Sequence, residues 1–158
     1  MPPAVVATVV PSIGALKSFV GQKLGTSDWT TVSQQQIQAF AEATGDHQWI
    51  HVDVERARRE SPFKQPIAHG YLTIALAPVL LPQIVRVDGV RMAVNYGLES
   101  MRLPAPVPSG ARVRMSAELK DVREMPGGGA RATWSLTFEV ETGGKPVCVA
   151  DAIYVYLP

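Results

Sequence analysis

Residues 71–77 read Tyr-Leu-Thr-Ile-Ala-Leu-Ala and follow directly on Ala68-His69-Gly70. This run has helical character and is apolar on nearly every side, which is typical of a helix buried at the centre of a domain. Pro78 and Pro82 are expected to kink or end it, because proline lacks the N–H that a helix interior needs. The stretch therefore predicts a single central helix around which the rest of the chain must pack.

The chain that follows this helix has strand character instead. Runs rich in Val, Ile, Thr, Tyr and Trp alternate with turn residues, as expected for an antiparallel meander. The four expected strands cover residues 91–103, 111–121, 130–141 and 146–156. One buried helix and four long strands predict an α+β fold in which a curved antiparallel sheet wraps around the helix.

The chain before the central helix is expected to contain several short helices and, at residues 23–31, a short extended piece. Residues 1–11 are expected to form a loose N-terminal tail, and residues 12–20 an amphipathic helix. A further helix should begin at Ser33, three residues before Gln36, and end at Gly45. The last segments before the centre are predicted to be a loop at 46–52 and a short charged helix at 54–60.

Composition restricts both the organisation and the partners of the protein. A chain of 158 residues fits one domain, predicted to span 1–158. The net charge of +1 argues against a nucleic-acid partner. The apolar stretch 71–81 is too short to cross a bilayer, so no membrane association is expected. A single cysteine, Cys148, fits a reducing, cytoplasmic compartment.

The three histidines, His47, His51 and His69, all fall between residues 45 and 70. The five-residue spacing of Asp46 and His51 in a loop lets both side chains face one water molecule, where one group takes a proton from it and the other delivers a proton to carbon. The alternative is that Asp46 caps the turn and His51 packs under Trp49. A metal site is not expected, because Gly45 breaks the helix that would align the ligands.

Gly70 lies where the first N–H groups of the central helix have no partner within the helix. A thioester carbonyl placed there would be polarised, and its enolate would be stabilised. The alternative is an ordinary loop glycine before a helix. The neighbouring His69 either orients the loop through a hydrogen bond or contacts a ligand.

Two stretches of this region resemble the signature of the MaoC-like (R)-specific enoyl-CoA hydratases. They read Gly-Asp-His-Gln-Trp-Ile-His-Val-Asp at 45–53 and Ile-Ala-His-Gly-Tyr-Leu-Thr at 67–73. The resemblance implies a hot-dog fold, a homodimer, and hydration of a trans-2-enoyl-CoA thioester to the (R)-3-hydroxyacyl-CoA. It assigns water activation to Asp46 and His51 and the oxyanion donor to the N–H of Gly70, with no cofactor beyond the CoA of the substrate.

This sequence also departs from the family pattern. Many members have Asn-Pro where this chain has Gln48-Trp49, so Trp49 is expected to narrow the acyl tunnel or to stack on the ligand. The stretch 95–98, Asn-Tyr-Gly-Leu, resembles a nodulation-protein-N-like subgroup, and Asn95 is expected near the substrate or the dimer interface. Tyr71, Leu72 and Ile74 are further candidates for contact with the acyl chain, which is expected to lie in an apolar tunnel beside the central helix.

Two other functions remain open at this point. Thioesterases share the hot-dog fold but often carry a carboxylate on the central helix, and residues 71–87 contain no Asp or Glu. A non-catalytic module that binds acyl-CoA would bind the thioester without turnover.

Overall fold

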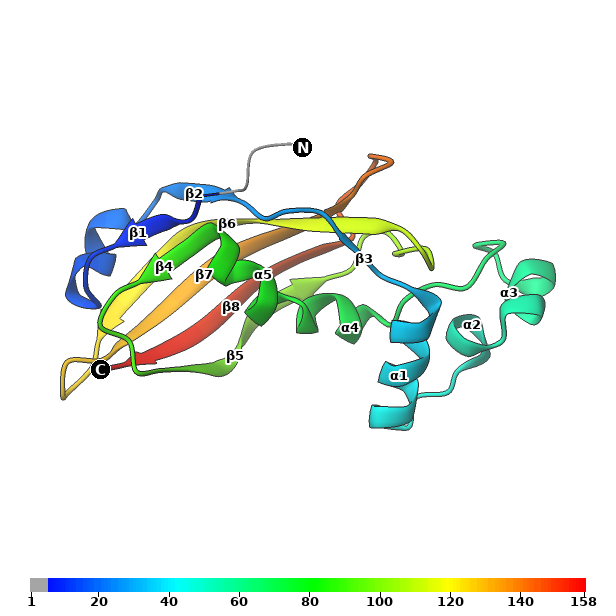
Figure 1. Ribbon diagram of the computed structural model, residues 1–158, viewed down its shortest axis with the longest axis horizontal. Coiled ribbons are helices and arrows are strands. Elements are labelled where there is room, and N and C mark those ends of the chain that lie inside the picture. The colour runs from blue at the N-terminus through cyan, green and yellow to red at the C-terminus, as the bar shows by residue number, and fades with distance from the viewer. Residues whose placement is uncertain (1–5) are drawn as a thin grey trace.

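The computed structural model describes residues 6–158 and consists of one long, curved antiparallel sheet with helices along one face and at one end (Figure 1). The strand order is β2-β6-β7-β8-β5, and β3 also pairs with β6. The bounds are β2 Lys23–Thr26, β3 Thr30–Thr31, β5 Met92–Arg102, β6 Arg112–Glu124, β7 Ala130–Val140 and β8 Cys148–Leu157. Each of the four expected strands is thus present, with ends shifted by a few residues.

The central helix packs on the face of this sheet in two segments, α4 (Gly70–Ala75) and α5 (Ala77–Ile84). The break falls at Leu76, next to Pro78 in the first turn of α5, whereas Pro82 is accommodated inside α5. Both segments contribute buried side chains to the core that they share with β7 and β8. The predicted α+β arrangement, a curved sheet around a central helix, is confirmed.

Three helices gather beyond one end of the sheet: α1 (Gln34–Thr44), α2 (Trp49–Val52) and α3 (Val54–Glu60) (Figure 1). Helix α1 begins as predicted, since the Ser33 hydroxyl accepts a hydrogen bond from the Gln36 N–H. It also ends as predicted, at Gly45 in the left-handed conformation (φ 82°). The loop expected at 46–52 is wrong in its second half, where α2 forms one helical turn.

The N-terminal region is more ordered than its sequence indicated. The loose tail expected for 1–11 is wrong at Thr8–Val10, which forms strand β1 and pairs in parallel with β4 (Val85–Val87). Residues 1–5 of that expected tail lie outside the described part of the chain. The helix expected at 12–20 is a short 3-10 helix, η1, at Gly14–Phe19. A strand 75 residues further on supplies the hydrogen bonds that order β1, and local pattern does not reveal such a partner.

One side of the molecule remains apolar and exposed. Edge strand β5 pairs only with β8, and its Val94, Tyr96 and Leu98 side chains are 39%, 59% and 45% exposed. On the central helix, Tyr71 and Val79 are 70% and 66% exposed, so the expectation of a helix buried on all sides is wrong for this face. No helix within residues 6–158 is long and apolar enough to cross a membrane.

Candidate active site

Asp46 lies at the junction between α1 and α2, where Gly45 turns the chain out of the first helix. Its Oδ1 accepts a hydrogen bond from the Gln48 N–H at 3.3 Å, so the capping role considered from the sequence is present. Oδ2 has no hydrogen bond with any residue in the described part of the chain, and the side chain is exposed. Capping therefore leaves one carboxylate oxygen available for a ligand or water.

His51 is held from two sides on α2 and is only 6% exposed. Its Nδ1 lies 2.7 Å from the carbonyl oxygen of Ile67, and because a carbonyl only accepts, Nδ1 carries the proton and Nε2 presents a lone pair. The Gln34 side-chain amide donates to the His51 carbonyl at 2.8 Å and fixes the backbone. Burial is the main cause that lowers the pKa of His51 below its ordinary value of 6.5, which favours the neutral base.

His69, the residue before α4, connects the two halves of this region. Its Nε2 donates to the backbone carbonyl of Asp46 at 3.0 Å, and its ring stacks on His51 with centroids 4.0 Å apart. The Phe40 ring also contacts His69, with ring centroids 4.9 Å apart and the two rings tilted by 52°. The hydrogen bond considered for His69 is therefore present, and the ring that stacks on His51 is that of His69.

One carboxylate oxygen of Asp46 and one ring nitrogen from each of His51 and His69 lie within 4.8 Å of one another. One water can join two polar atoms at this separation, because each of its hydrogen bonds spans about 2.8 Å. A metal ion fits less well, since it requires imidazole lone pairs that converge in their ring planes. The rings of His51 and His69 instead stack at an interplanar angle of 27°, so their planes run side by side and do not meet at one point between them.

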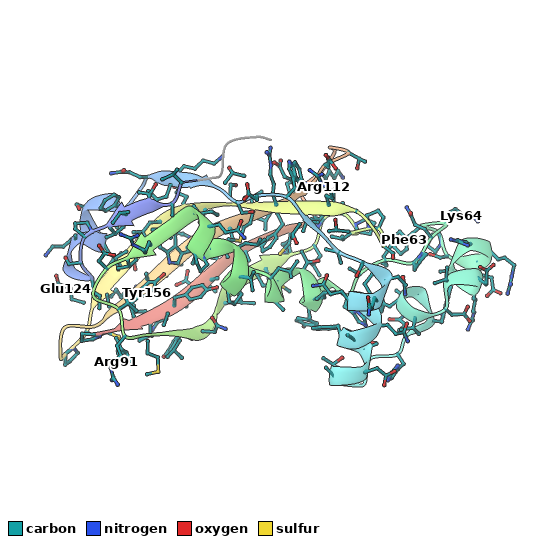
Figure 2. All side chains as sticks on the ribbon, in the orientation of Figure 1. Phe63, Lys64, Arg91, Arg112, Glu124 and Tyr156 are labelled. Carbon is teal, nitrogen blue, oxygen red and sulfur yellow. The ribbon has the colours of Figure 1, made fainter. Side chains whose placement is uncertain are left out.

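Gly70 opens α4 beside this cluster and shares a cavity of about 280 Å³ with His51 and Thr73. As the first residue of the helix, it has an N–H without a carbonyl partner in α4. A Cβ added at Gly70 would overlap the end of the half-exposed Leu103 side chain, so a larger residue fits here only if Leu103 rotates away. The cavity also contains Phe63, from the loop between α3 and α4 (Figure 2).

The remaining sequence candidates lie away from this cavity. Trp49 is half-buried beneath the Arg56 guanidinium, which lies 4.3 Å from its ring centroid. Leu72 packs in the core, and Tyr71 points outward from α4. Asn95 lines two other cavities, which run beside α5. The structure thus brings together Asp46, His51, His69 and Gly70, and it does not bring these four candidates to them.

Sequence reasoning missed several residues that shape the cavity. Ile67 supplies the carbonyl for His51, Gln34 anchors its backbone, and Leu103 covers Gly70. Their types are ordinary for a core or a helix start, so composition gives no signal. The proline-rich segment 104–110, which begins next to Leu103, was the nearest available indication.

Comparison with known proteins now assigns the class. A family model described as "MaoC like domain" matches residues 16–133, which is most of the chain. The chain is 50% identical over 146 residues to 3-hydroxyacyl-thioester dehydratase Z of Mycobacterium tuberculosis, covering 92% of this chain and 96% of that protein. It is 41% identical over 145 residues to nodulation protein N of Rhizobium meliloti, covering 91% and 90%.

The (R)-hydratase of A. caviae is similar in structure, with a TM-score of 0.70 and 27% identity over 88% of this chain and 96% of that one. The chain therefore belongs to the MaoC-like dehydratase family and has the hot-dog fold. Within that family it is a hydratase/dehydratase, a hydro-lyase.

Proposed function

We propose that this protein catalyses the reversible, (R)-specific hydration of trans-2-enoyl-CoA to (R)-3-hydroxyacyl-CoA. The observation that carries the proposal is the grouping of the Asp46 carboxylate and the His51 imidazole within 4.8 Å, beside the free N–H at the start of α4. The 3-hydroxyacyl thioester in the name of the mycobacterial relative and the (R)-hydratase activity of the structural relative support this substrate class.

In the proposed reaction, Asp46 and His51 hold one water between them. The water oxygen bonds to C3, and one group of the Asp46–His51 pair accepts the proton that the water loses. The pair then delivers a proton to C2, so that one water molecule is added overall. The two groups are proposed to face the same side of the substrate, so that oxygen and proton add to one face of the double bond. The (R) configuration then depends on which face of C3 they meet, and its support is the similarity to an (R)-hydratase. The Ile67 carbonyl supports this role because it keeps the Nε2 lone pair of His51 free.

The thioester carbonyl is proposed to accept a hydrogen bond from the Gly70 N–H. The enolate oxygen that forms during addition carries more charge than the ground-state carbonyl, so this donor stabilises the transition state more than the substrate. Both proton transfers are assigned to side chains of the protein. The reaction therefore needs no cofactor beyond the CoA that the substrate carries.

The acyl chain is proposed to extend from Gly70 along the central helix. An apolar cavity of about 340 Å³ lies between this helix and strands β5 and β8, and its lining begins at Ile74, one turn after Gly70. Of the residues expected to border such a tunnel, Ile74 lines this cavity. A cytoplasmic location also belongs to the proposal, since the single cysteine, Cys148, is a free buried thiol.

The test is hydration of crotonyl-CoA, followed by loss of the enoyl absorbance, in the wild type and in Asp46→Asn and His51→Ala. Each variant is expected to lose at least about 100-fold in kcat, the usual scale of acid–base catalysis. Lys17→Ala, which removes an exposed ion pair with Glu124, is the control and should retain full activity.

If either site variant unfolds at the same temperature as the wild type and keeps full activity, the substituted residue does not take part in catalysis. Release of free thiol without hydration would identify a thioesterase. Binding of crotonyl-CoA without any turnover would identify the non-catalytic module.

A further inference from the structure

Two cavities adjoin one another along the central helix and continue away from the catalytic pair. The first, of about 340 Å³, begins at Ile74, and the second, of about 470 Å³, extends to Tyr156. They share Pro78, Asn95 and Tyr154 in their linings. Figure 2 shows Tyr156 toward the opposite end of the long axis from Phe63, which borders the catalytic cavity.

Tyr154 is the unusual residue in this apolar lining. Only 7% of the residue is exposed, but its hydroxyl is not fully enclosed by protein and forms no hydrogen bond with any residue between 6 and 158. Buried tyrosine hydroxyls normally find a partner. Tyr156, two residues further on the same strand, follows this rule, because its hydroxyl accepts a hydrogen bond from Trp134 Nε1 at 3.1 Å. The Tyr154 hydroxyl therefore remains available to whatever occupies the cavities.

Asn95 brings a second polar group to the same point. It is the register partner of Tyr154 across β5 and β8, so both side chains leave the sheet on the same face. The ladder shifts between Asn95 and Gly97, and such bulges re-aim side chains next to functional sites. Asn95 is exposed toward these cavities, and its side-chain amide, like the Tyr154 hydroxyl, forms no hydrogen bond with another residue of the described structure.

An alkyl chain that filled both cavities would displace water from these two groups without replacing its hydrogen bonds, and this loss would weaken binding. A chain that carries an oxygen at this point would restore them. A hydroxyl group is the best match, because it can donate to the Asn95 amide oxygen and accept from the Tyr154 hydroxyl.

We propose that Tyr154 and Asn95 select acyl thioesters that carry a hydroxyl or keto oxygen partway along the acyl chain. This inference rests on the proposed hydratase function and names the substrate class of the same site. Pro78, which borders both cavities, lies at the start of α5, one whole helical segment beyond Gly70 at the start of α4. The selected oxygen therefore lies well beyond C2 and C3, where the addition takes place.

The experiment compares kcat/KM for trans-2-dodecenoyl-CoA with values for analogues of the same length that carry one hydroxyl group at successive positions from mid-chain onward. One position is expected to react roughly tenfold better than the plain chain, the effect of one hydrogen bond to a buried group. Tyr154→Phe and Asn95→Leu should each abolish this preference. Tyr156→Phe, whose hydroxyl is already bonded to Trp134, should retain it.

Equal values for all analogues in the wild type, or a preference that survives in Tyr154→Phe, would overturn the inference while leaving the hydratase function intact. Absence of hydration with every enoyl-CoA would instead overturn the proposed function. Thermal unfolding and molecular mass are measured for each variant. A loss of preference in Asn95→Leu that coincides with a change of mass would assign Asn95 to a subunit contact and also overturn the inference.

Discussion

His51 shows how one residue acquires its chemistry from its surroundings. Removal from water lowers its pKa, and the nearby His69 lowers it further. The hydrogen bond to the Ile67 carbonyl and the charge of Asp46 act in the opposite direction, but burial is the largest effect. His51 is therefore a neutral base near pH 7, with its lone pair directed away from Ile67.

The pH dependence of activity follows from this lowered pKa. We expect kcat/KM for crotonyl-CoA to fall on the acidic side with a midpoint below 6.5, the ordinary value for histidine. Removal of the carboxylate in Asp46→Asn should move the pKa of His51 further down, as measured by NMR titration of its ring protons. An acidic midpoint at or above 6.5, or an upward shift in Asp46→Asn, would contradict this account.

The same shift has a consequence for stability. The folded pKa lies below the unfolded one, so the unfolded chain binds the extra proton more readily as the pH falls. The stability that His51 contributes is fully present above about pH 6.5, the pKa of a free histidine, and is lost as the pH falls toward the folded pKa.

At the scale of elements, the site lies where the ends of three helices and the end of one strand come together. The end of α1 positions Asp46, the single turn of α2 positions His51, and the start of α4 positions Gly70. Just beyond the end of β5, Leu103 lies against Gly70 and forms part of the wall of the cavity. Glycine at position 70 therefore leaves room for the Leu103 side chain beside the start of α4.

This contact predicts the effect of Gly70→Ala. The added methyl group overlaps the end of the Leu103 side chain, which is 44% exposed and can rotate away, so we expect a cost of about 1 kcal/mol, the lower end for overpacking. We expect slightly lower stability to urea and slower crotonyl-CoA hydration, because Leu103 lines the same cavity as His51. Leu103→Ala in the same chain should restore much of the stability. A Gly70→Ala variant as stable and active as the wild type would show that the contact is not restrictive.

At the scale of the whole molecule, the exposed face formed by β5 and the outer side of the central helix calls for a covering partner. A second copy of the chain is the occupant that we propose, since β5 is an edge strand that an identical antiparallel strand can extend. Such a dimer would also close the cavities that open on this face.

Val94→Asp places a charge near the start of this edge strand and is expected to convert a dimer into a monomer, measured by sedimentation equilibrium. Val149→Asp, at a similarly exposed position on β8, adds the same charge outside the proposed contact and should remain dimeric. A wild type that is monomeric at micromolar concentration, or a Val94→Asp variant that stays dimeric, would rule out this interface.

The sequence by itself determined what depends on near neighbours along the chain. Ser33 and Gly45 define the ends of α1 through hydrogen bonds and backbone conformations within a few residues. The alternation of the four long strands and the apolar run of the central helix were equally readable, because period and burial are linked locally. The closeness of Asp46 and His51 also follows from their spacing.

Only the tertiary structure decided the contacts between distant residues. The stack of His51 on His69, the cover of Leu103 over Gly70, and the pairing of β1 with β4 each join segments that are far apart along the chain. The same holds for Tyr154 and Asn95, which the register of β5 on β8 brings together. Local pattern cannot determine such contacts, because packing of the whole chain selects which apolar faces and strand edges meet.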